Sequence, residues 1–257
     1  MNELFSIEGK VAVVTGGSRG IGLMIARGFV EAGARVYISS RNADACTEAV
    51  AELSKLGTCM AIPADLGTGA GCRGLSEKIG KREERLHILV NNAGSNWGAP
   101  LAEYPDAAFD KVFALNVKGV FTLTRLLVPL LEKAASDDDP ARVINIGSID
   151  GLQAPELETY AYSSSKAAVH HLTRTLAHRL ARSRITVNAI APGPFESKMM
   201  AATLERFGDQ IRASNPMGRI GRPDDMAGTA IFLASRAGSY LTGAVIPVDG
   251  GISTRRG

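Results

Sequence analysis

The sequence has little cysteine and few aromatic residues, and it lacks any long apolar run. Its 257 residues include 3 cysteines, which are widely spaced and never form a C-x-x-C pair. This pattern excludes a disulfide framework and favours free thiols in a reducing compartment. The N-terminus has no basic segment followed by an apolar core, and no uninterrupted apolar run reaches the length of a membrane span. We therefore expect a cytoplasmic protein with no membrane partner.

Charge of one sign is also scarce. The formal net charge is +3, and lysine and arginine are scattered along a chain with 5% aromatic residues. A nucleic-acid partner is not expected, because its interface would need a basic stripe. No metal site is expected either, since His170, His171 and His178 share a predicted helix without an H-E-x-x-H arrangement. Surface or subunit-interface positions are favoured for these three histidines.

Seven short runs rich in β-branched residues set the architecture. Each run predicts a strand buried on both faces, and amphipathic stretches of helical period lie between the runs. The runs are 11–15, 34–39, 59–64, 86–90, 142–146, 185–190 and 244–248. Their alternation predicts an α/β fold with one domain over residues 1–257, doubly wound, with a seven-stranded parallel sheet flanked by helices. The acidic run 137–139 is expected to be a solvated loop, because a domain boundary there would divide the sheet.

A glycine-rich turn, TGGSRGIG over 15–22, follows the first predicted strand and leads into a predicted helix. Exposed backbone N–H groups and the helix dipole would both favour an anion there. The spacing of Gly16, Gly20 and Gly22 does not match G-x-G-x-x-G, and no lysine closes the turn as in a P-loop. A turn whose glycines serve backbone geometry alone is the alternative.

The end of the second predicted strand, YISSRN, bears on the choice of dinucleotide. NAD-binding proteins of this architecture place a carboxylate there to bind the ribose. This chain has Ser39, Ser40 and Arg41 instead, and a second cation, Arg19, lies in the glycine turn. Arginine can pair with a 2′-phosphate that a carboxylate would repel, so the pair favours NADPH over NADH. Either arginine alone could equally be a solvated surface side chain.

Helical spacing distinguishes between the two tyrosines of TYAYSSSK, residues 159–166. Tyr162 and Lys166 are four residues apart, so they share one helix face. An ammonium about 4 Å from the phenol contributes on the order of 4 kcal/mol at an effective dielectric of about 20, enough to lower the pKa by up to roughly three units. Tyr160 has Ser164 at the same spacing and therefore lacks such a partner.

Two further residues are candidates for contact with a substrate. Ser148 follows a predicted strand at the ligand-bearing edge of the sheet, where its hydroxyl could hydrogen-bond a carbonyl oxygen. It is not expected to be a nucleophile, because NIGSIDG does not supply the G-x-S-x-G elbow. Trp97 is expected either to line the substrate pocket or to pack in the core.

Taken together and in order, these motifs resemble the short-chain dehydrogenase/reductase family over essentially the whole chain. The matching segments are TGGSRGIG, Asp65 in ADL, NNAG at 91–94, Asn116 in LNV, Ser148, YSSSK at 162–166, NAIAPG at 188–193, and YLTG and VDGG near the C-terminus. The resemblance implies a Rossmann fold, with Asn116, Ser148, Tyr162 and Lys166 as the catalytic set. Tyr162 would be the general acid in carbonyl reduction, Ser148 would hold the carbonyl, Lys166 would lower the pKa of the tyrosine and hold the ribose, and Asn116 would position a relay water.

The resemblance also implies a complete NADPH site. The residues expected to contact NADPH or NADP⁺ are Gly16, Ser18, Arg19, Gly20, Ile21, Gly22, Ser40, Arg41, Asp65, Leu66, Asn92, Ala93, Gly94, Tyr162, Lys166, Pro192, Gly193 and Ser197. Ser197 stands where the family usually has threonine, so a hydroxyl is kept. The substrate is expected to meet Ser148, Tyr162 and Trp97.

Within the family, the chain is similar to the β-ketoacyl reductases of the rhamnolipid-pathway type, on the evidence of SNWGAPL, DDDPARVINIGS and the step from Ser148 to Tyr162. The expected reaction is NADPH-dependent reduction of a ketone or 3-ketoacyl thioester. A carbonyl reductase that does not act on thioesters, a non-catalytic NADPH-binding sensor and, more remotely, a serine hydrolase are the alternatives. Acyl carrier protein is an open partner, because docking enzymes are expected to be basic where this chain has 137–139. A lid at about 194–217 and a homotetramer paired through the helices near Phe109 and Tyr162 are implied as well.

Overall fold

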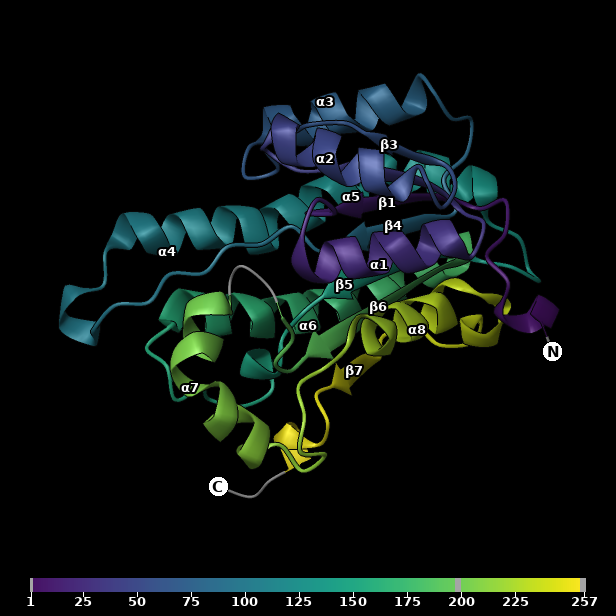
Figure 1. Cartoon of the computed structure of the whole chain (residues 1–257). Helices are drawn as coiled ribbons and strands as arrows, with labels where there is room; N and C mark the ends of the chain where they lie inside the picture. The colour runs from purple at the N-terminus through teal and green to yellow at the C-terminus, as the bar shows by residue number, and fades with distance from the viewer. Residues whose placement is uncertain (1, 197–199, 255–257) are drawn as a thin grey trace.

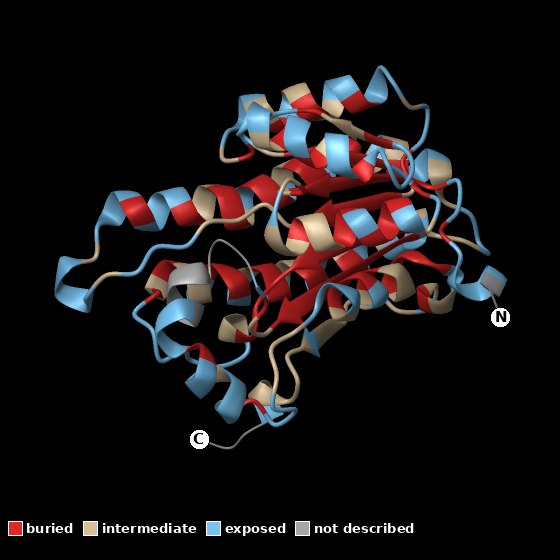
Figure 2. Ribbon diagram, viewed as in Figure 1, coloured by how far each residue is buried: buried red, intermediate tan, exposed pale blue. Residues whose placement is uncertain are grey.

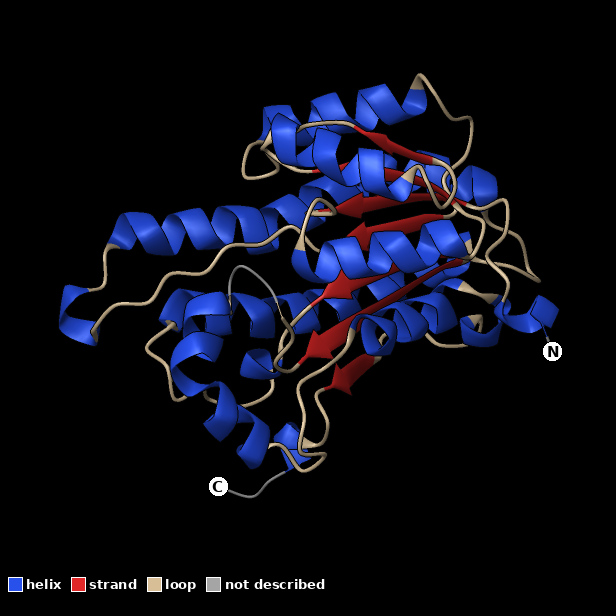
Figure 3. Cartoon of the chain, in the orientation of Figure 1, coloured by secondary structure: helices blue, strands red, loops and turns tan. Residues whose placement is uncertain are grey.

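A computed structural model describes residues 2–196 and 200–254. It contains a seven-stranded parallel sheet in the order β3-β2-β1-β4-β5-β6-β7, whose strands follow one another from β3 near the top to β7 near the bottom of Figures 1 and 3. The strands are β1 Val11–Thr15, β2 Arg35–Ser39, β3 Cys59–Ala61, β4 Ile88–Asn91, β5 Ala141–Ile146, β6 Ile185–Pro192 and β7 Val245–Val248. The prediction of a single doubly wound domain is confirmed.

The β-branched runs form strands because both faces of the sheet are covered by helices. In β1, Ala12 and Val14 face one core cluster, while Val11 and Val13 face the other. Successive strand side chains point to opposite faces, so a continuous apolar run supplies both cores. Figure 2 shows the resulting buried interior of the sheet.

The helices divide between the two faces of the sheet. Those whose apolar residues enter the first cluster are α1 Gly20–Glu31, α2 Ala43–Leu53 and α8 Pro223–Ala234. Those that enter the second are α3 Gly69–Gly80, α5 Val120–Ala134 and α6 Tyr160–Leu180. Two more, α4 Asp106–Phe113 and α7 Ala201–Ser214, extend away from the sheet on the side where the strands end (Figure 1).

Helices α4 and α5 are joined by a π-helical turn, Ala114–Gly119, into one stretch over Asp106–Ala134. By length and composition alone this stretch could cross a membrane, although it contains no uninterrupted apolar run. Leu123, Leu127 and Leu131 are buried in the core beneath the sheet. Burial inside the fold therefore accounts for these three leucines.

In the acidic loop after α5, Asp137 and Asp138 are exposed as predicted, whereas Asp139 is half-buried. The Lys10 ammonium lies 2.8 Å from a carboxylate oxygen of Asp139, and the Arg142 guanidinium lies 3.1 Å from the other. Arg142 is 1% exposed and also donates to the carbonyls of Leu233 and Ser235 at the end of α8. Asp139 thus compensates two buried cations, which would be costly to leave unpaired.

The two ends of the segment that contains α7 lie next to each other. The Gly221 N–H donates to the Pro194 carbonyl at 2.9 Å, and Phe195 pairs with Gly221 in an isolated parallel bridge. Phe195 is buried, so this end of the segment is anchored in the core. The helix of the expected lid is present, whereas movement of the lid stays a prediction.

Candidate active site

Three of the four glycines in the 15–22 turn, Gly16, Gly20 and Gly22, are required by local geometry. Gly16 and Gly20 have positive φ angles of 65° and 53°. A β-carbon on Gly16 would lie 2.6 Å from Asn92 Nδ2, and one on Gly22 would overlap the Gly16 carbonyl oxygen. Although the spacing of these glycines does not match G-x-G-x-x-G, it lets this turn pass close to both α1 and the end of β4.

The N-terminus of α1 is open toward the sheet edge. Arg19 is the N-cap residue and its side chain makes no capping hydrogen bond, and the first turn, which starts at Gly20 and contains Ile21 and Gly22, has no acidic residue. Its backbone N–H groups and the helix dipole are thus available to an anion. Ser18 precedes this N-cap in the turn.

Hydrogen bonds from the NNAG segment connect the end of β4 to the glycine turn. Thr15 Oγ1 accepts hydrogen bonds from the N–H groups of Asn92 and Ala93, at 2.9 and 3.0 Å. Asn92 Nδ2 donates to the Thr15 carbonyl at 2.9 Å. A β-carbon on Gly94 would lie 3.4 Å from Asn116 Oδ1 and 3.8 Å from Lys166 Nζ. The same short segment therefore connects the glycine turn to the expected catalytic residues.

Two exposed arginines lie around the end of β2. The Gly16 N–H donates to the Ser39 carbonyl at 2.6 Å, which sets the glycine turn beside this strand end and its following residues Ser40 and Arg41. Arg19 and Arg41 are both exposed, and no carboxylate among the described residues forms an ion pair with either. Two free cations beside a helix N-terminus fit a ligand with several phosphates.

The other expected dinucleotide contacts lie on the loops that leave β3 and β6. Asp65 is exposed and its carboxylate accepts from the Gly67 N–H at 3.1 Å, and Leu66 is buried behind it. Pro192 ends β6, and the Gly193 N–H donates to the Val248 carbonyl at 3.0 Å. Ser197 lies outside the described residues.

The structure brings Tyr162, Lys166 and Ser148 together at the end of β5. The ammonium of Lys166 lies 5.4 Å from the centre of the Tyr162 ring and donates to the Ile146 carbonyl at 2.7 Å. Ser148 is buried, and its Oγ accepts from the Asp150 N–H at 3.1 Å. The phenol of Tyr162 shares a hydrogen bond with the Ser148 hydroxyl. One donor hydroxyl, one phenol and one cation thus converge on one point.

The acid–base properties of this group differ from those predicted. Burial raises the pKa of Tyr162 to about 12, with the hydrogen bond to Ser148 lowering it and the Asp150 carboxylate raising it. Burial also lowers the pKa of Lys166 to about 8, which Asp150 partly offsets. The pKa of Tyr162 is therefore raised, not lowered as predicted, because desolvation outweighs the hydrogen bond to Ser148.

Asn116 lies in the π-helical turn and its side chain is fully engaged. Its Oδ1 accepts from the Ser95 N–H at 2.9 Å, and its Nδ2 donates to the Ser95 carbonyl at 3.0 Å and to Ser165 Oγ at 2.9 Å. The wider π turn lets this one side chain reach both the loop after β4 and α6. A role in holding a relay water stays a prediction.

Several side chains differ from their expected surroundings. His170 is 3% exposed, so the prediction of a surface or interface position is wrong for this residue. His171 and His178 are exposed, as predicted for a surface position. Trp97 is 46% exposed, which excludes core packing. Tyr160 donates to Glu158 at 2.9 Å and packs edge-on against Tyr104, as expected of a tyrosine without a lysine partner.

Two residues with a bearing on the site were not predicted. Asp150 affects the pKa values of both Tyr162 and Lys166, and Ser95 holds both ends of the Asn116 amide. In the sequence, Asp150 in SIDG is indistinguishable from an ordinary turn residue, so no signal singled it out. Within 2–196 and 200–254, no cluster of three or more His, Cys, Asp or Glu residues could hold a metal ion.

Comparison with known proteins gives consistent results. Residues 16–253 match the family described as enoyl-(acyl carrier protein) reductase. The rhamnolipids biosynthesis 3-oxoacyl-[acyl-carrier-protein] reductase of Pseudomonas aeruginosa is 53% identical over 253 residues, 98% of this chain and 99% of that protein. The solved Pseudomonas aeruginosa RhlG/NADP active-site complex has a TM-score of 0.95 and 52% identity, over 98% of this chain and 100% of that one. A gluconate 5-dehydrogenase from Burkholderia cenocepacia, solved with NADP and tartrate, has a TM-score of 0.91 and 32% identity, over 99% of each chain.

Proposed function

This chain belongs to the short-chain dehydrogenase/reductase family, and on that premise we propose that it reduces a ketone or a 3-oxoacyl thioester to the secondary alcohol with NADPH. The observation that carries the proposal is the convergence of Ser148, Tyr162 and Lys166 beside an open helix N-terminus with two unpaired arginines. A dinucleotide binder that does no chemistry would not need this arrangement of hydroxyl, phenol and cation.

The three residues divide the chemistry between them. NADPH, when bound, supplies the hydride for the carbonyl carbon. Ser148 donates a hydrogen bond to the carbonyl oxygen, and Tyr162 transfers its phenolic proton to that oxygen as negative charge develops on it. With a pKa of about 12, Tyr162 is fully protonated at neutral pH, which is the form a general acid requires.

Lys166 has a supporting role in this mechanism. Its pKa of about 8 keeps most of it charged at neutral pH, where a cation next to the ring stabilises the phenolate left after proton transfer. Among the described residues, one of its three N–H groups donates a hydrogen bond, to the Ile146 carbonyl. The others are available to a ribose hydroxyl, so one ammonium can both hold the dinucleotide and stabilise the phenolate.

NADPH is favoured over NADH by charge at the end of β2. Arg19 and Arg41 are exposed cations without a carboxylate partner among the described residues, and Ser39–Ser40 take the place of an acid. The remaining expected contacts, from Asp65 to Gly193, lie on loops at the same sheet edge. The relative named above was solved with NADP, which supports the same choice for this chain.

An acyl substrate is supported by apolar side chains on the loops beside the site. Trp97 and Leu101 are 46% and 70% exposed on the loop after β4, and Leu157 is 56% exposed just before α6. Leu101 N–H donates to the Glu158 carboxylate at 3.2 Å, so the two loops adjoin. The similar reductase is named for 3-oxoacyl-[acyl-carrier-protein]. A carbonyl reductase for small polar ketones is the second candidate, favoured by the likeness to a gluconate 5-dehydrogenase.

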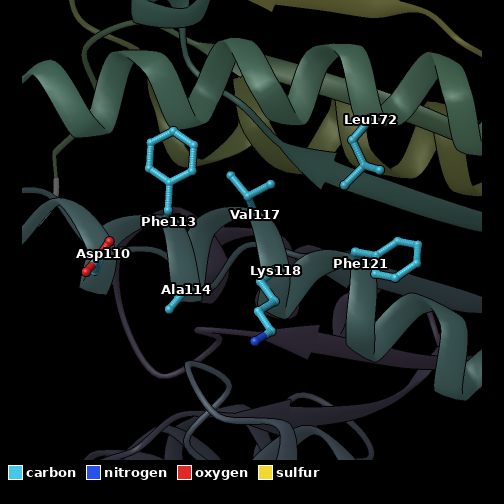
Figure 4. A pocket seen from close by; sticks show the side chains of 7 residues that line it. All are labelled: Asp110, Phe113, Ala114, Val117, Lys118, Phe121 and Leu172. Atoms are coloured by element: carbon cyan, nitrogen blue, oxygen red, sulfur yellow. The ribbon is translucent and has the colours of Figure 1, made fainter.

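We further propose that the protein is a cytoplasmic homotetramer, and that residues 194–217 of each subunit form a lid over the substrate. A surface pocket between α4–α5 and α6 supports subunit pairing, since its lining is largely apolar: Phe113, Ala114, Val117, Phe121 and Leu172, with Asp110 and Lys118 (Figure 4). Phe109 and Phe121 are exposed there by 37% and 44%. The three buried free thiols fit a reducing compartment.

Steady-state NADPH oxidation against small ketones, 3-oxoacyl-coenzyme A and 3-oxoacyl carrier protein tests the proposal. We expect the highest kcat/KM with a 3-oxoacyl thioester, and the two thioesters compared will show whether the carrier protein is recognised. Higher kcat/KM for polar ketones would favour the second candidate. Tight NADPH binding without reduction of any test compound would indicate a protein that only binds NADPH. Ester hydrolysis, together with labelling of Ser148 by a serine-directed reagent, would indicate a hydrolase.

A further inference from the structure

His170 is a buried titratable residue that the proposed mechanism does not use. It lies on α6, one helical turn after Lys166, and is 3% exposed. Neither of its ring nitrogens has a hydrogen-bond partner of ordinary geometry among the described residues. Buried polar groups are normally paired, so an unpaired imidazole in the core calls for a physical reason.

The ring is enclosed by the loop that carries Ser148. A β-carbon on Gly147 would overlap His170 Nε2 and would lie 2.6 Å from its Cδ2. One on Gly151 would lie 2.9 Å from His170 Cε1 and 2.6 Å from the Lys166 carbonyl carbon. The two glycines that touch the ring thus stand on either side of Ser148, and no larger residue fits at either place.

Burial, with a smaller contribution from neighbouring cations, keeps the ring neutral. Burial lowers the pKa of His170 to about 4, the Gly151 backbone partly raises it, and the cations Lys166 and Arg174 lower it further. Asp150, on the facing loop, is the nearby acid and has a pKa raised by burial. The imidazole therefore presents one N–H and one lone pair at neutral pH. Its polar neighbour is the backbone of Gly151.

A leucine would fill a similar volume without unpaired nitrogens, so core packing alone does not explain a histidine here. We propose that His170 is a positioning residue, whose flat ring packs against Gly147 and Gly151, seats the Gly147–Gly151 loop on α6 and thereby sets Ser148 relative to Tyr162 and Lys166. The inference rests on the proposed reductase activity, because its consequence is the geometry of carbonyl capture.

The proposal separates turnover from dinucleotide binding. His170 touches the Ser148 loop, whereas the glycine turn packs against the NNAG segment and the end of β2. A misplaced catalytic group loses rate because the reacting atoms leave their near-attack geometry. Loss of His170 should therefore lower kcat while the dissociation constant of NADPH stays unchanged. A residue that only supported the fold would lower the melting temperature instead.

The first test compares His170→Leu with His171→Leu, a matched change at the exposed neighbouring histidine. We expect His170→Leu to fold with a melting temperature at or above that of the wild type and to lose about tenfold in kcat. NADPH binding, measured by protein fluorescence, should be unaltered, and His171→Leu should match the wild type throughout. Wild-type kcat in a folded His170→Leu protein would overturn the proposal.

A double-mutant cycle keeps the proposal testable if His170→Leu does not fold. Gly147→Ala should lower kcat at least about tenfold while His170 is present, because the added methyl displaces the ring or the loop. In a His170→Ala background the same change should cost little. Equal effects in both backgrounds would overturn the proposal. An inactive wild-type protein in the NADPH assay would instead contradict the proposed function, so the two failures are distinguishable.

Discussion

At the scale of single residues, the charge of Asp150 acts beside burial on the pKa values of Tyr162 and Lys166. Its carboxylate raises the pKa values of Tyr162 and Lys166, since a negative charge favours their protonated forms. Asp150→Asn should therefore lower both pKa values. In the reduction direction Tyr162 must be protonated, so the fall in kcat/KM on the alkaline side should begin at lower pH than in the wild type.

The control for this prediction is Asp138→Asn, which removes an exposed carboxylate from the acidic loop at the opposite end of the sheet. Its pH profile should coincide with that of the wild type. Coincident alkaline limbs for the wild type and Asp150→Asn would show that the carboxylate has no influence on the acid–base pair.

A substitution at Arg41 tests whether this side chain binds the 2′-phosphate of NADPH. Replacing it with alanine removes a hydrogen bond between charged groups, worth about 1.5–3 kcal/mol, so the dissociation constant of NADPH should rise roughly ten- to hundredfold. NADH lacks that phosphate and serves as the internal control, with an unchanged dissociation constant by titration calorimetry. Equal losses for both dinucleotides would remove Arg41 from phosphate recognition.

The positions of the candidate catalytic residues were predictable where the signal is local. The four-residue step from Tyr162 to Lys166 fixes a shared helix face, and Ser148 follows a strand at the ligand-bearing edge. Neither the burial that raises the pKa of Tyr162 nor the enclosure of His170 could be predicted, because each depends on residues brought together by tertiary packing.

At the scale of elements, the close passage of the glycine turn against α1 predicts a strong effect of a single methyl group. Gly22→Ala should lower the free energy of unfolding by about 1–3 kcal/mol, because the added carbon overlaps the Gly16 carbonyl oxygen. Gly74→Ala, in α3 with open space around the added carbon, should instead raise it by about 0.5–1 kcal/mol. Urea denaturation measures both, and a neutral Gly22→Ala would contradict the close approach.

The elements themselves were largely predictable, because a strand buried on both faces has a distinctive run of β-branched residues. All seven predicted runs overlap the observed strands. The π-helical turn at Asn116 was not predictable, since its composition matches that of an ordinary helix. The ion pairs of Asp139 with Lys10 and Arg142 were not predictable either, because Lys10 lies 129 residues from Asp139 in the sequence.

At the scale of the whole molecule, the exposed apolar side chains on α5 predict self-association. Phe121→Glu places a charge in the pocket between α5 and α6 and should shift the proposed tetramer to smaller species in sedimentation velocity. Leu56→Glu, at a similarly exposed leucine on the far side of the sheet, is the matched control and should leave the tetramer intact. A wild-type monomer would contradict pairing through this face.

The central claim is that Tyr162 protonates a carbonyl that receives hydride from NADPH, and turnover of Tyr162→Phe tests it most directly. The variant keeps the ring that packs on Lys166 but lacks the acidic proton. With the best 3-oxoacyl or ketone substrate, kcat for NADPH oxidation should fall at least about a hundredfold, while the dissociation constant of NADPH changes little. A kcat near that of the wild type would show that another group supplies the proton.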